Sequence, residues 1–233
     1  MEQINSFDLD KIRKDAAKKI LEQPSEYITN SLSGREFEKD KFIAYASKLI
    51  KRNFEIDAKN EKVVSNLWDY FFNPAKFDKE NKVYSSGKGI MLYGAPGSGK
   101  SELMRIFCNL VKGISDVEFI FARFYTLSGK VEELGNQAFK PNTNHILFDE
   151  LGLERCKAIK RYGASIDVDE EIILMRYDEF RNGTVTHFTT NLTAEMLKAR
   201  YNPRVLSRLN QMCNVMSLTG VDRRATARPT RNY

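Results

Sequence analysis

The chain has 233 residues, of which 42% are hydrophobic and 11% aromatic, and its formal net charge is +6. This composition excludes a disordered chain, and the length allows one or two domains with a buried core. The sequence has no apolar stretch near the roughly 20 residues that span a bilayer and no secretory signal at its start, so we expect a cytoplasmic protein without a membrane partner. Three widely spaced cysteines without a CxxC pair predict reduced thiols rather than disulfides or a metal centre.

The first part of the chain is highly charged and is predicted to be helical. Apolar residues recur there at helical spacing in three runs, within residues 9–20, 42–50 and 63–71. The stretch 72–89 contains proline, serine and glycine and is typical of a linker. We therefore predict a helical, partner-binding region at residues 1–85 and a second unit at residues 86–233 that ends in a basic tail.

Beyond residue 88, short apolar strands alternate with helical stretches. The predicted strands are Gly89–Tyr93, Val117–Phe124, His145–Phe148, Val185–Thr190 and Asn214–Leu218. The helical stretches lie near residues 100–112, 128–138, 168–182 and 193–211, and Pro203 should interrupt the last of them. This alternation predicts an α/β fold, in which helices cover both faces of a parallel sheet.

The segment after the first predicted strand fits the pattern G-x-x-x-x-G-K-[ST] and precedes a predicted helix. Its residues are Gly94, Ala95, Pro96, Gly97, Ser98, Gly99, Lys100 and Ser101. Glycines allow positive φ, so successive backbone N–H groups can turn inward and bind an anion, together with the N-terminus of the following helix. Lys100 can neutralise the β- and γ-phosphates, and the Ser101 hydroxyl can ligate Mg²⁺. The segment therefore predicts a site for ATP and Mg²⁺.

The apolar strand within residues 145–152 ends in the acidic pair Asp149 and Glu150. Carboxylates at the carboxyl end of a parallel strand emerge where ligands bind. We expect Asp149 to hold Mg²⁺, through water, and Glu150 to orient and polarise the attacking water, a role worth about 10²–10⁴-fold. The alternative for the pair on its own is a solvated acidic turn. The adjacent glutamate also argues against a small-molecule kinase, which needs no group that activates water.

The strand within residues 186–192 ends in Thr190 and Asn191. The Asn191 amide could hydrogen-bond the γ-phosphate or the attacking water. The alternative is that Thr190, Asn191 or Thr193 is the N-cap of the next helix.

Two arginines, Arg204 and Arg208, lie at i and i+4 on one face of a predicted helix. Arginine suits bidentate contact with phosphate, and a surface salt bridge is the alternative. From Lys198 to the last residue, basic side chains far outnumber the single acidic one, Asp222, so the positive surplus of the chain is concentrated at this end. A basic end favours contact with the phosphates of a nucleotide or of DNA, although it could also be a solubilising tail.

The segments GAPGSGKS, ILFDELG, FTTNL, YNPRVLSRL and VDRR occur in the order typical of the DnaC/IstB-like group of AAA+ ATPases, which the chain resembles over about residues 88–225. The resemblance implies a P-loop NTPase of three αβα layers with a five-stranded parallel sheet of order 5-1-4-3-2. It implies that Asn191 is sensor 1 and that Arg208 is an arginine finger acting in trans within a homo-oligomer. Arg204 matches a second arginine of that helix, and Arg223 or Arg224 matches the arginine after the last strand, for which we choose Arg224.

Two features depart from this group. Only 13 residues follow Gly220, so we expect no helical lid after the ATPase core. Glu102 stands where many members have histidine, which places a carboxylate next to the predicted metal and nucleotide site.

The resemblance implies a DnaC-like helicase loader, an ATP-dependent DNA replication protein that hydrolyses ATP in an oligomer and contacts DNA, expected to be single-stranded. Its N-terminal helices would bind the replicative helicase. One alternative is an IstB-like transposition helper that acts on duplex DNA with a transposase, and another is a nucleotide-dependent switch with little turnover. The motifs do not decide between loader and helper, although the length and the helical N-terminal region favour the loader.

Several other histidine, aromatic and basic residues could have a binding role, but packing or solvent exposure is the simpler interpretation. His145 and His187 lie in predicted strands and are expected to be packing residues. The aromatic run 67–72 could stack bases but has the spacing of a helix core face. Lys157 and the pair 160–161 could touch DNA but are expected in a solvated loop.

Overall fold

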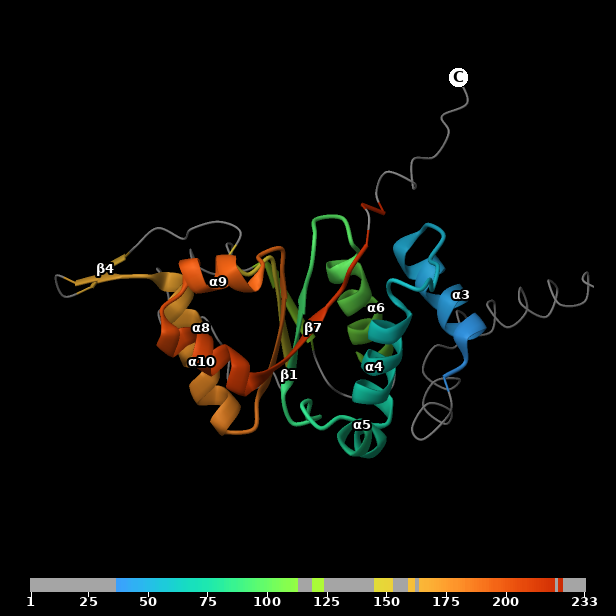
Figure 1. Ribbon diagram of the computed structural model, residues 1–233, viewed down its shortest axis with the longest axis horizontal. Coiled ribbons are helices and arrows are strands. Elements are labelled where there is room, and N and C mark those ends of the chain that lie inside the picture. Colours follow the sequence, from blue (N-terminus) through green and yellow to red (C-terminus); the bar gives the residue numbers. More distant parts are fainter. Residues whose placement is uncertain are drawn as a thin grey trace, which may run out of the picture.

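The computed structural model describes residues 37–112, 119–123, 145–152, 159–161, 164–220 and 222–223 (Figure 1). Its centre is a parallel sheet built from β1 (Gly89–Tyr93), β2 (Phe119–Arg123), β3 (His145–Asp149), β6 (Val185–Thr190) and β7 (Cys213–Ser217). The strand order is β2-β3-β6-β1-β7, and every neighbouring pair is parallel. Numbered as core strands one to five, this is the order 5-1-4-3-2, so the predicted sheet is confirmed.

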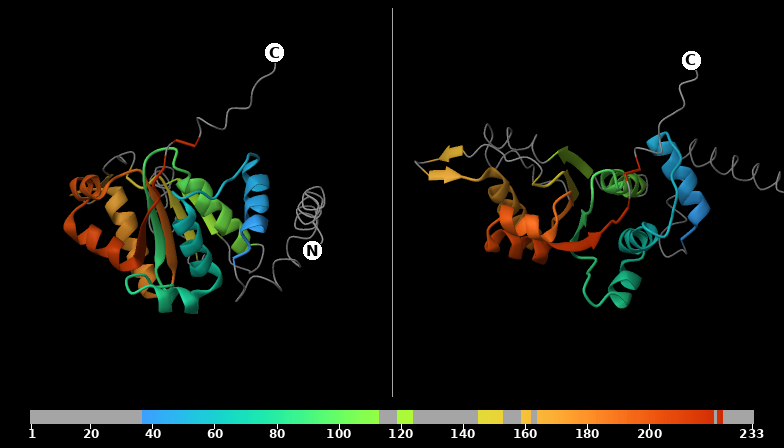
Figure 2. Two further views of the ribbon diagram at one scale, coloured as in Figure 1. Left: turned by 45° about the vertical axis from the view of Figure 1, so that its right-hand side comes forward. Right: turned by 45° about the horizontal axis from the view of Figure 1, so that its top comes forward.

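Helices cover both faces of the sheet, as Figures 1 and 2 show. On one side lie α3 (Lys39–Ile50), α4 (Glu61–Phe72), α5 (Pro74–Glu80) and α6 (Lys100–Lys112). On the other side lie α8 (Val168–Arg181), α9 (Ala194–Arg200) and α10 (Pro203–Met212). Each side has its own hydrophobic cluster, and β1 contributes Ile90 and Leu92 to one and Met91 to the other. This double burial explains the uninterrupted apolar run of β1, and the three αβα layers are as predicted.

The helices before residue 86 share their core with the sheet layer. Phe42 of α3 lies 5.1 Å from the ring of Phe107 on α6, and Phe71 of α4 stacks on Phe107 at 5.7 Å. Leu67 and Trp68 are buried in the same cluster, so the aromatic run 67–72 is a core face, as predicted.

The stretch 72–89 is more structured than a linker. Helix α5 begins with Pro74 in its first turn, where a missing N–H costs nothing. The following residues are fixed on the edge strand β7, because the Asn214 side chain accepts from Ser85 N at 2.8 Å and the Tyr84 hydroxyl donates to Val215 O at 3.1 Å. At the start of β1, a Cβ on Gly89 would lie 1.8 Å from Thr186 O, so only glycine allows β1 and β6 to approach this closely.

Most element boundaries agree with the sequence predictions. The interruption at Pro203 is confirmed, since α9 ends at Arg200 and the Asn202 side chain caps α10 by accepting from Val205 N at 3.0 Å. Residues 160–161 were expected in a loop, which is wrong: Ile159–Arg161 (β4) pairs antiparallel with Ala164–Ile166 (β5). The predicted helices within 9–20 and at 128–138 lie outside the described residues.

Two side-chain predictions are also confirmed. His187 is fully buried, and its Nδ1 accepts a hydrogen bond from Ile90 N at 3.1 Å, so it is a packing residue. Cys108 and Cys213 are free buried thiols, and burial raises the pKa of both. The side chain of His145, and Cys156 and Lys157, lie outside what the structure describes. Within the described helices, none is long and apolar enough to cross a membrane.

Candidate functional site at the carboxyl edge of the sheet

The loop between β1 and α6 wraps around the start of α6. Gly97 and Gly99 have φ of 78° and 94°, a left-handed backbone that other residues adopt at a cost. A Cβ on Gly97 would also lie 2.0 Å from a carboxylate oxygen of Asp222, so the C-terminal segment packs directly against this glycine. Leu103 N donates to Gly99 O at 2.8 Å and starts the helix. Gly97 and Gly99 of the predicted P-loop thus lie where the backbone has positive φ, and Gly97 also allows the close approach of Asp222.

Lys100 is buried and folds back into this loop. Its Nζ donates to Gly94 O at 2.8 Å, to Ala95 O at 2.9 Å and to Ser98 Oγ at 3.3 Å. A buried ammonium requires such acceptors. Phosphate oxygens would be stronger acceptors than carbonyls, because both partners of each hydrogen bond would then be charged. The loop therefore presents a buried cation where an anion can replace neutral oxygens.

Asp149 stands at the end of β3, next to Ser101 at the start of α6. Its Oδ1 accepts from Ser101 Oγ at 2.5 Å and from the buried Thr189 hydroxyl on the neighbouring strand β6. Its Oδ2 lies 3.5 Å from Arg105 Nη2. A hydroxyl and a carboxylate are hard oxygen ligands, and Mg²⁺ commonly takes one or two protein ligands and completes its shell with water and phosphate oxygens. Ser101 and Asp149 therefore fit a magnesium site.

Glu150 follows in a left-handed conformation with φ of 64°, unusual for a residue with a side chain. Its backbone N donates to Thr189 Oγ1 at 3.1 Å, so one buried hydroxyl holds both members of the acidic pair. Glu150 and Asn191 line a cavity of about 220 Å³ together with Lys100, Ser101 and Asp149, which we call the phosphate cavity. The helix cap that was an alternative for Asn191 is formed by Thr193, which accepts from Met196 N at 3.3 Å.

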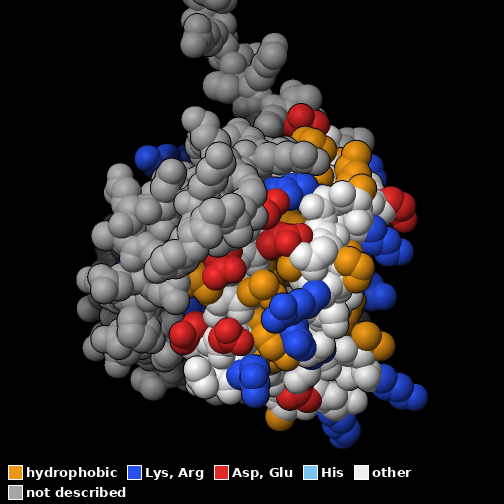
Figure 3. Space-filling view, turned by 90° about the vertical axis from the view of Figure 1, so that its left-hand side faces the viewer, with side chains coloured by type: hydrophobic (Ala, Val, Ile, Leu, Met, Phe, Trp, Pro, Cys, Tyr) orange, Lys and Arg blue, Asp and Glu red, His pale blue; other side chains and the backbone are white. Residues whose placement is uncertain are grey.

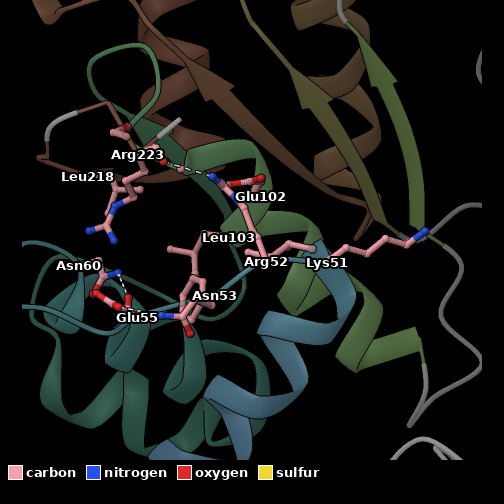
Figure 4. Close-up of a pocket in the computed structure, with 13 residues that line it drawn as sticks. Lys51, Arg52, Asn53, Glu55, Asn60, Glu102, Leu103, Leu218 and Arg223 are labelled. Carbon is pink, nitrogen blue, oxygen red and sulfur yellow. Dashed lines mark hydrogen bonds and ion pairs between the residues drawn. The ribbon is translucent and has the colours of Figure 1, made fainter. Parts of the chain in front are cut away.

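A second cavity of about 700 Å³ adjoins the first, between the connection from α3 to α4 and the first turn of α6 (Figure 4). Phe54, Leu103 and Leu218 form apolar parts of its wall, and Asn60 and Glu55 lie across from the P-loop. We call it the α3–α4 cavity. Its volume is in the range of small-molecule pockets.

Arg52 and Arg223 form hydrogen bonds and ion pairs that connect the segments lining this cavity. Arg52 forms an ion pair with Glu102 and donates to Arg223 O at 3.2 Å. Arg223 N donates to Gly97 O at 2.9 Å, and its guanidinium donates to Asp57 at 2.7 Å. Burial alone would raise the pKa of Asp57, but amide hydrogen bonds and the guanidinium lower it, so Asp57 is a stable anchor. The segment after β7 is thereby fixed across the P-loop.

The arginines of α10 lie away from both cavities of their own subunit. The Arg208 guanidinium stacks 4.3 Å from the ring centroid of Tyr177 on α8 and donates to the Tyr177 hydroxyl at 3.0 Å. Arg204 is exposed and forms no hydrogen bond or ion pair with the part of the chain that the structure describes. Arg200, by contrast, pairs with Asp167 and with buried Asp169. Figure 3 shows this face, where basic and acidic side chains are mixed.

The structure brings together the predicted P-loop, Asp149, Glu150 and Asn191, whereas Arg224 lies outside the described residues. Glu102 points toward Arg52, as Figure 4 shows, and also lines the phosphate cavity. Four site residues were missed: Arg52, Arg105, Arg123 and Thr189. Helical spacing could have found Arg105, which is four residues after Ser101, and strand alternation could have found Thr189. No sequence signal points to Arg52.

Comparison with solved structures identifies the fold. The DnaC helicase loader is similar at 18% sequence identity, with a TM-score of 0.52 over 71% of this chain and 93% of the loader. A candidate primosome component from Streptococcus pyogenes serotype M3 has 19% identity and a TM-score of 0.53 over 72% of this chain and 83% of its own. AMPPCP-bound DnaA from Aquifex aeolicus has 14% identity and a TM-score of 0.53 over 71% of this chain and 48% of DnaA. The chain thus has the P-loop α/β fold of DnaC-like AAA+ domains. No protein-family model matches it, and no curated protein does.

Proposed function

We propose that the protein binds and hydrolyses ATP and acts in DNA replication as a DnaC-like helicase loader. The observation that carries the ATPase part is the meeting of Lys100, Ser101, Asp149 and Glu150 around one cavity. The loader part is supported by the fold, which the chain shares with a DnaC helicase loader, and by the predicted helices before residue 86.

The two cavities adjoin each other and together could hold a nucleoside triphosphate. The phosphates would lie in the phosphate cavity, where their oxygens replace the loop carbonyls as acceptors for Lys100. Ser101 and Asp149 would hold Mg²⁺, which neutralises negative charge on the phosphates. Base and ribose would enter the α3–α4 cavity, against Phe54 and Leu103.

The remaining residues of the phosphate cavity suit hydrolysis. The Glu150 carboxylate would accept a proton from the attacking water. The hydrogen bond from Glu150 N to Thr189 Oγ1 holds the backbone from which this side chain projects. The Asn191 amide would hydrogen-bond the γ-phosphate or the same water. This arrangement favours an ATPase over a switch with little turnover.

Arg208 would complete the site of a neighbouring subunit. Its side chain lies on α8 and does not line either cavity of its own chain, so an effect on hydrolysis requires a second copy. An arginine supplied in trans can be worth about 10³–10⁵ in phosphoryl transfer. Arg204, exposed on the same helix, would contact the same neighbour. The site is therefore shared within a homo-oligomer.

The partners follow from the loader assignment. The helices before residue 86 would bind a replicative helicase, and basic side chains would hold single-stranded DNA. The test uses the full-length protein with purified replicative helicase, ATP and circular single-stranded DNA, and measures helicase loaded on the DNA. Loading that needs ATP and disappears with Lys100→Ala supports the proposal. ATPase activity without loading, but with recruitment of a transposase to duplex DNA, would instead establish the transposition helper.

A further inference from the structure

Arg105 occupies an unusual place at the edge of the phosphate cavity. It lies one helical turn after Ser101 on α6, so both side chains project toward Asp149. Ser101 holds Oδ1 of that carboxylate at 2.5 Å, and Arg105 Nη2 lies 3.5 Å from Oδ2. The Arg105 side chain is 50% exposed, whereas the Asp149 side chain is 12% exposed. Arg105 thus extends from the solvent-exposed surface to Asp149, the carboxylate proposed to bind Mg²⁺.

The other cations around this cavity are differently placed. Lys100 is held by loop carbonyls, and Arg52 is paired with Glu102. Arg123 ends β2 at the position paired with Asp149, lines the same cavity and is exposed. Among the described residues, Arg105 is therefore the cation that forms an ion pair with Asp149. Its contact is long and half-exposed, which makes it weak and easily exchanged.

Binding of a metal at Asp149 would weaken the ion pair between Arg105 and Asp149. A divalent cation beside Ser101 and Asp149 would neutralise the carboxylate and repel the guanidinium, because like charges a few ångströms apart in a partly buried site repel strongly. A γ-phosphate brings new negative charge into the same cavity. The arginine side chain is long and flexible, and its planar group binds phosphate oxygens through two parallel hydrogen bonds.

We propose that Arg105 exchanges Asp149 for the terminal phosphate when a triphosphate binds, and so discriminates ATP from ADP within a single subunit. This inference rests on the proposed function, since it needs a nucleotide in the cavity. It differs from the role of Arg208, because Arg105 lines the cavity of its own chain. Arg123 borders the same cavity and would assist. The alternative is a purely structural counterion for Asp149, which would affect ATP and ADP alike.

The test compares two nucleotides that differ in the terminal phosphate. Binding of ADP and of AMPPCP is measured by calorimetry with Mg²⁺ for the full-length protein and for Arg105→Ala, Arg105→Lys and the matched control Lys112→Ala, which removes an exposed cation from the end of the same helix. We expect Arg105→Ala to weaken AMPPCP binding by about 10-fold to 100-fold, the loss typical of a hydrogen bond to a charged group, and ADP binding by less than about 2-fold. Arg105→Lys should recover part of the AMPPCP affinity, and Lys112→Ala should bind both nucleotides normally.

Each outcome has a defined meaning. A selective loss for AMPPCP supports the inference. Equal losses for both nucleotides, or no loss, overturn it while leaving the proposed ATPase intact. If the unaltered protein binds neither nucleotide, the proposed function fails and the inference fails with it. Thermal unfolding of each variant without nucleotide shows whether the fold is preserved, which we expect because the Arg105 side chain is half-exposed.

Discussion

The buried hydroxyl of Thr189 allows a prediction worked out from the structure. Its Oγ1 donates to Asp149 and accepts from Glu150 N at 3.1 Å, so it links the metal-binding carboxylate to the backbone of the proposed base. Thr189→Val keeps the shape and removes both hydrogen bonds. The bond to a charged group is worth about 1.5–3 kcal/mol and the neutral one about 0.5–1.5 kcal/mol. We expect the free energy of unfolding to fall by about 2–4.5 kcal/mol.

The same substitution should also slow ATP hydrolysis, because the acidic pair loses its common support. A loss of about 1.4 kcal/mol in transition-state stabilisation corresponds to about 10-fold in rate. The matched control is Thr186→Val on the same strand, whose buried hydroxyl accepts from Arg176 Nε at 2.8 Å and lies at the other end of β6. It should cost similar stability, measured by urea unfolding, and leave the rate per folded subunit within about 2-fold. Equal rates for Thr189→Val and the unaltered protein would refute the linkage.

Further predictions concern the proposed reaction and its partners. Glu150→Gln should retain ATP and lose about 10²–10⁴-fold in hydrolysis; normal turnover in that variant would remove Glu150 from the mechanism. Arg208→Ala should be inactive alone but regain activity when mixed with Lys100→Ala, which supplies the arginine; no rescue at any mixing ratio would argue against a shared site. Arg223→Ala removes the contact to Asp57 and should weaken binding of ATP by about 5-fold in equilibrium titrations, the size of a half-exposed ion pair. If the basic end binds single-stranded DNA, log affinity should fall with log salt by roughly 0.7 per phosphate contact, and deleting residues 224–233 should reduce that slope.

The sequence predicted the parts of the molecule that depend on local chemistry. The P-loop was predictable because its glycines, lysine and serine must follow one another along the chain, between a strand and a helix. The sheet was predictable because short strands rich in apolar residues alternate with helices, and the family resemblance supplied their order. Asp149 and Glu150 followed because parallel strands direct their carboxyl ends to one edge.

Several of the missed features depend on contacts between distant segments. Arg52 reaches Glu102 and Arg223 O only because the connection after α3 passes beside α6 and the segment after β7. The stretch 72–89 has the composition of a linker, yet its backbone finds partners on β7 that local composition does not reveal. Likewise, the sequence offered a salt bridge as the alternative for Arg208, whereas the structure stacks it on Tyr177.

The most direct test of the account is equilibrium binding of ATP with Mg²⁺ to the full-length protein and to Lys100→Ala. The Lys100 ammonium is buried among loop oxygens that phosphate can replace, so its loss removes the central cation of the site. We predict that the unaltered protein binds ATP and that Lys100→Ala binds it at least about 100-fold more weakly. Equal binding by the two proteins, or none by the unaltered protein, would contradict the claim that this loop binds a nucleoside triphosphate.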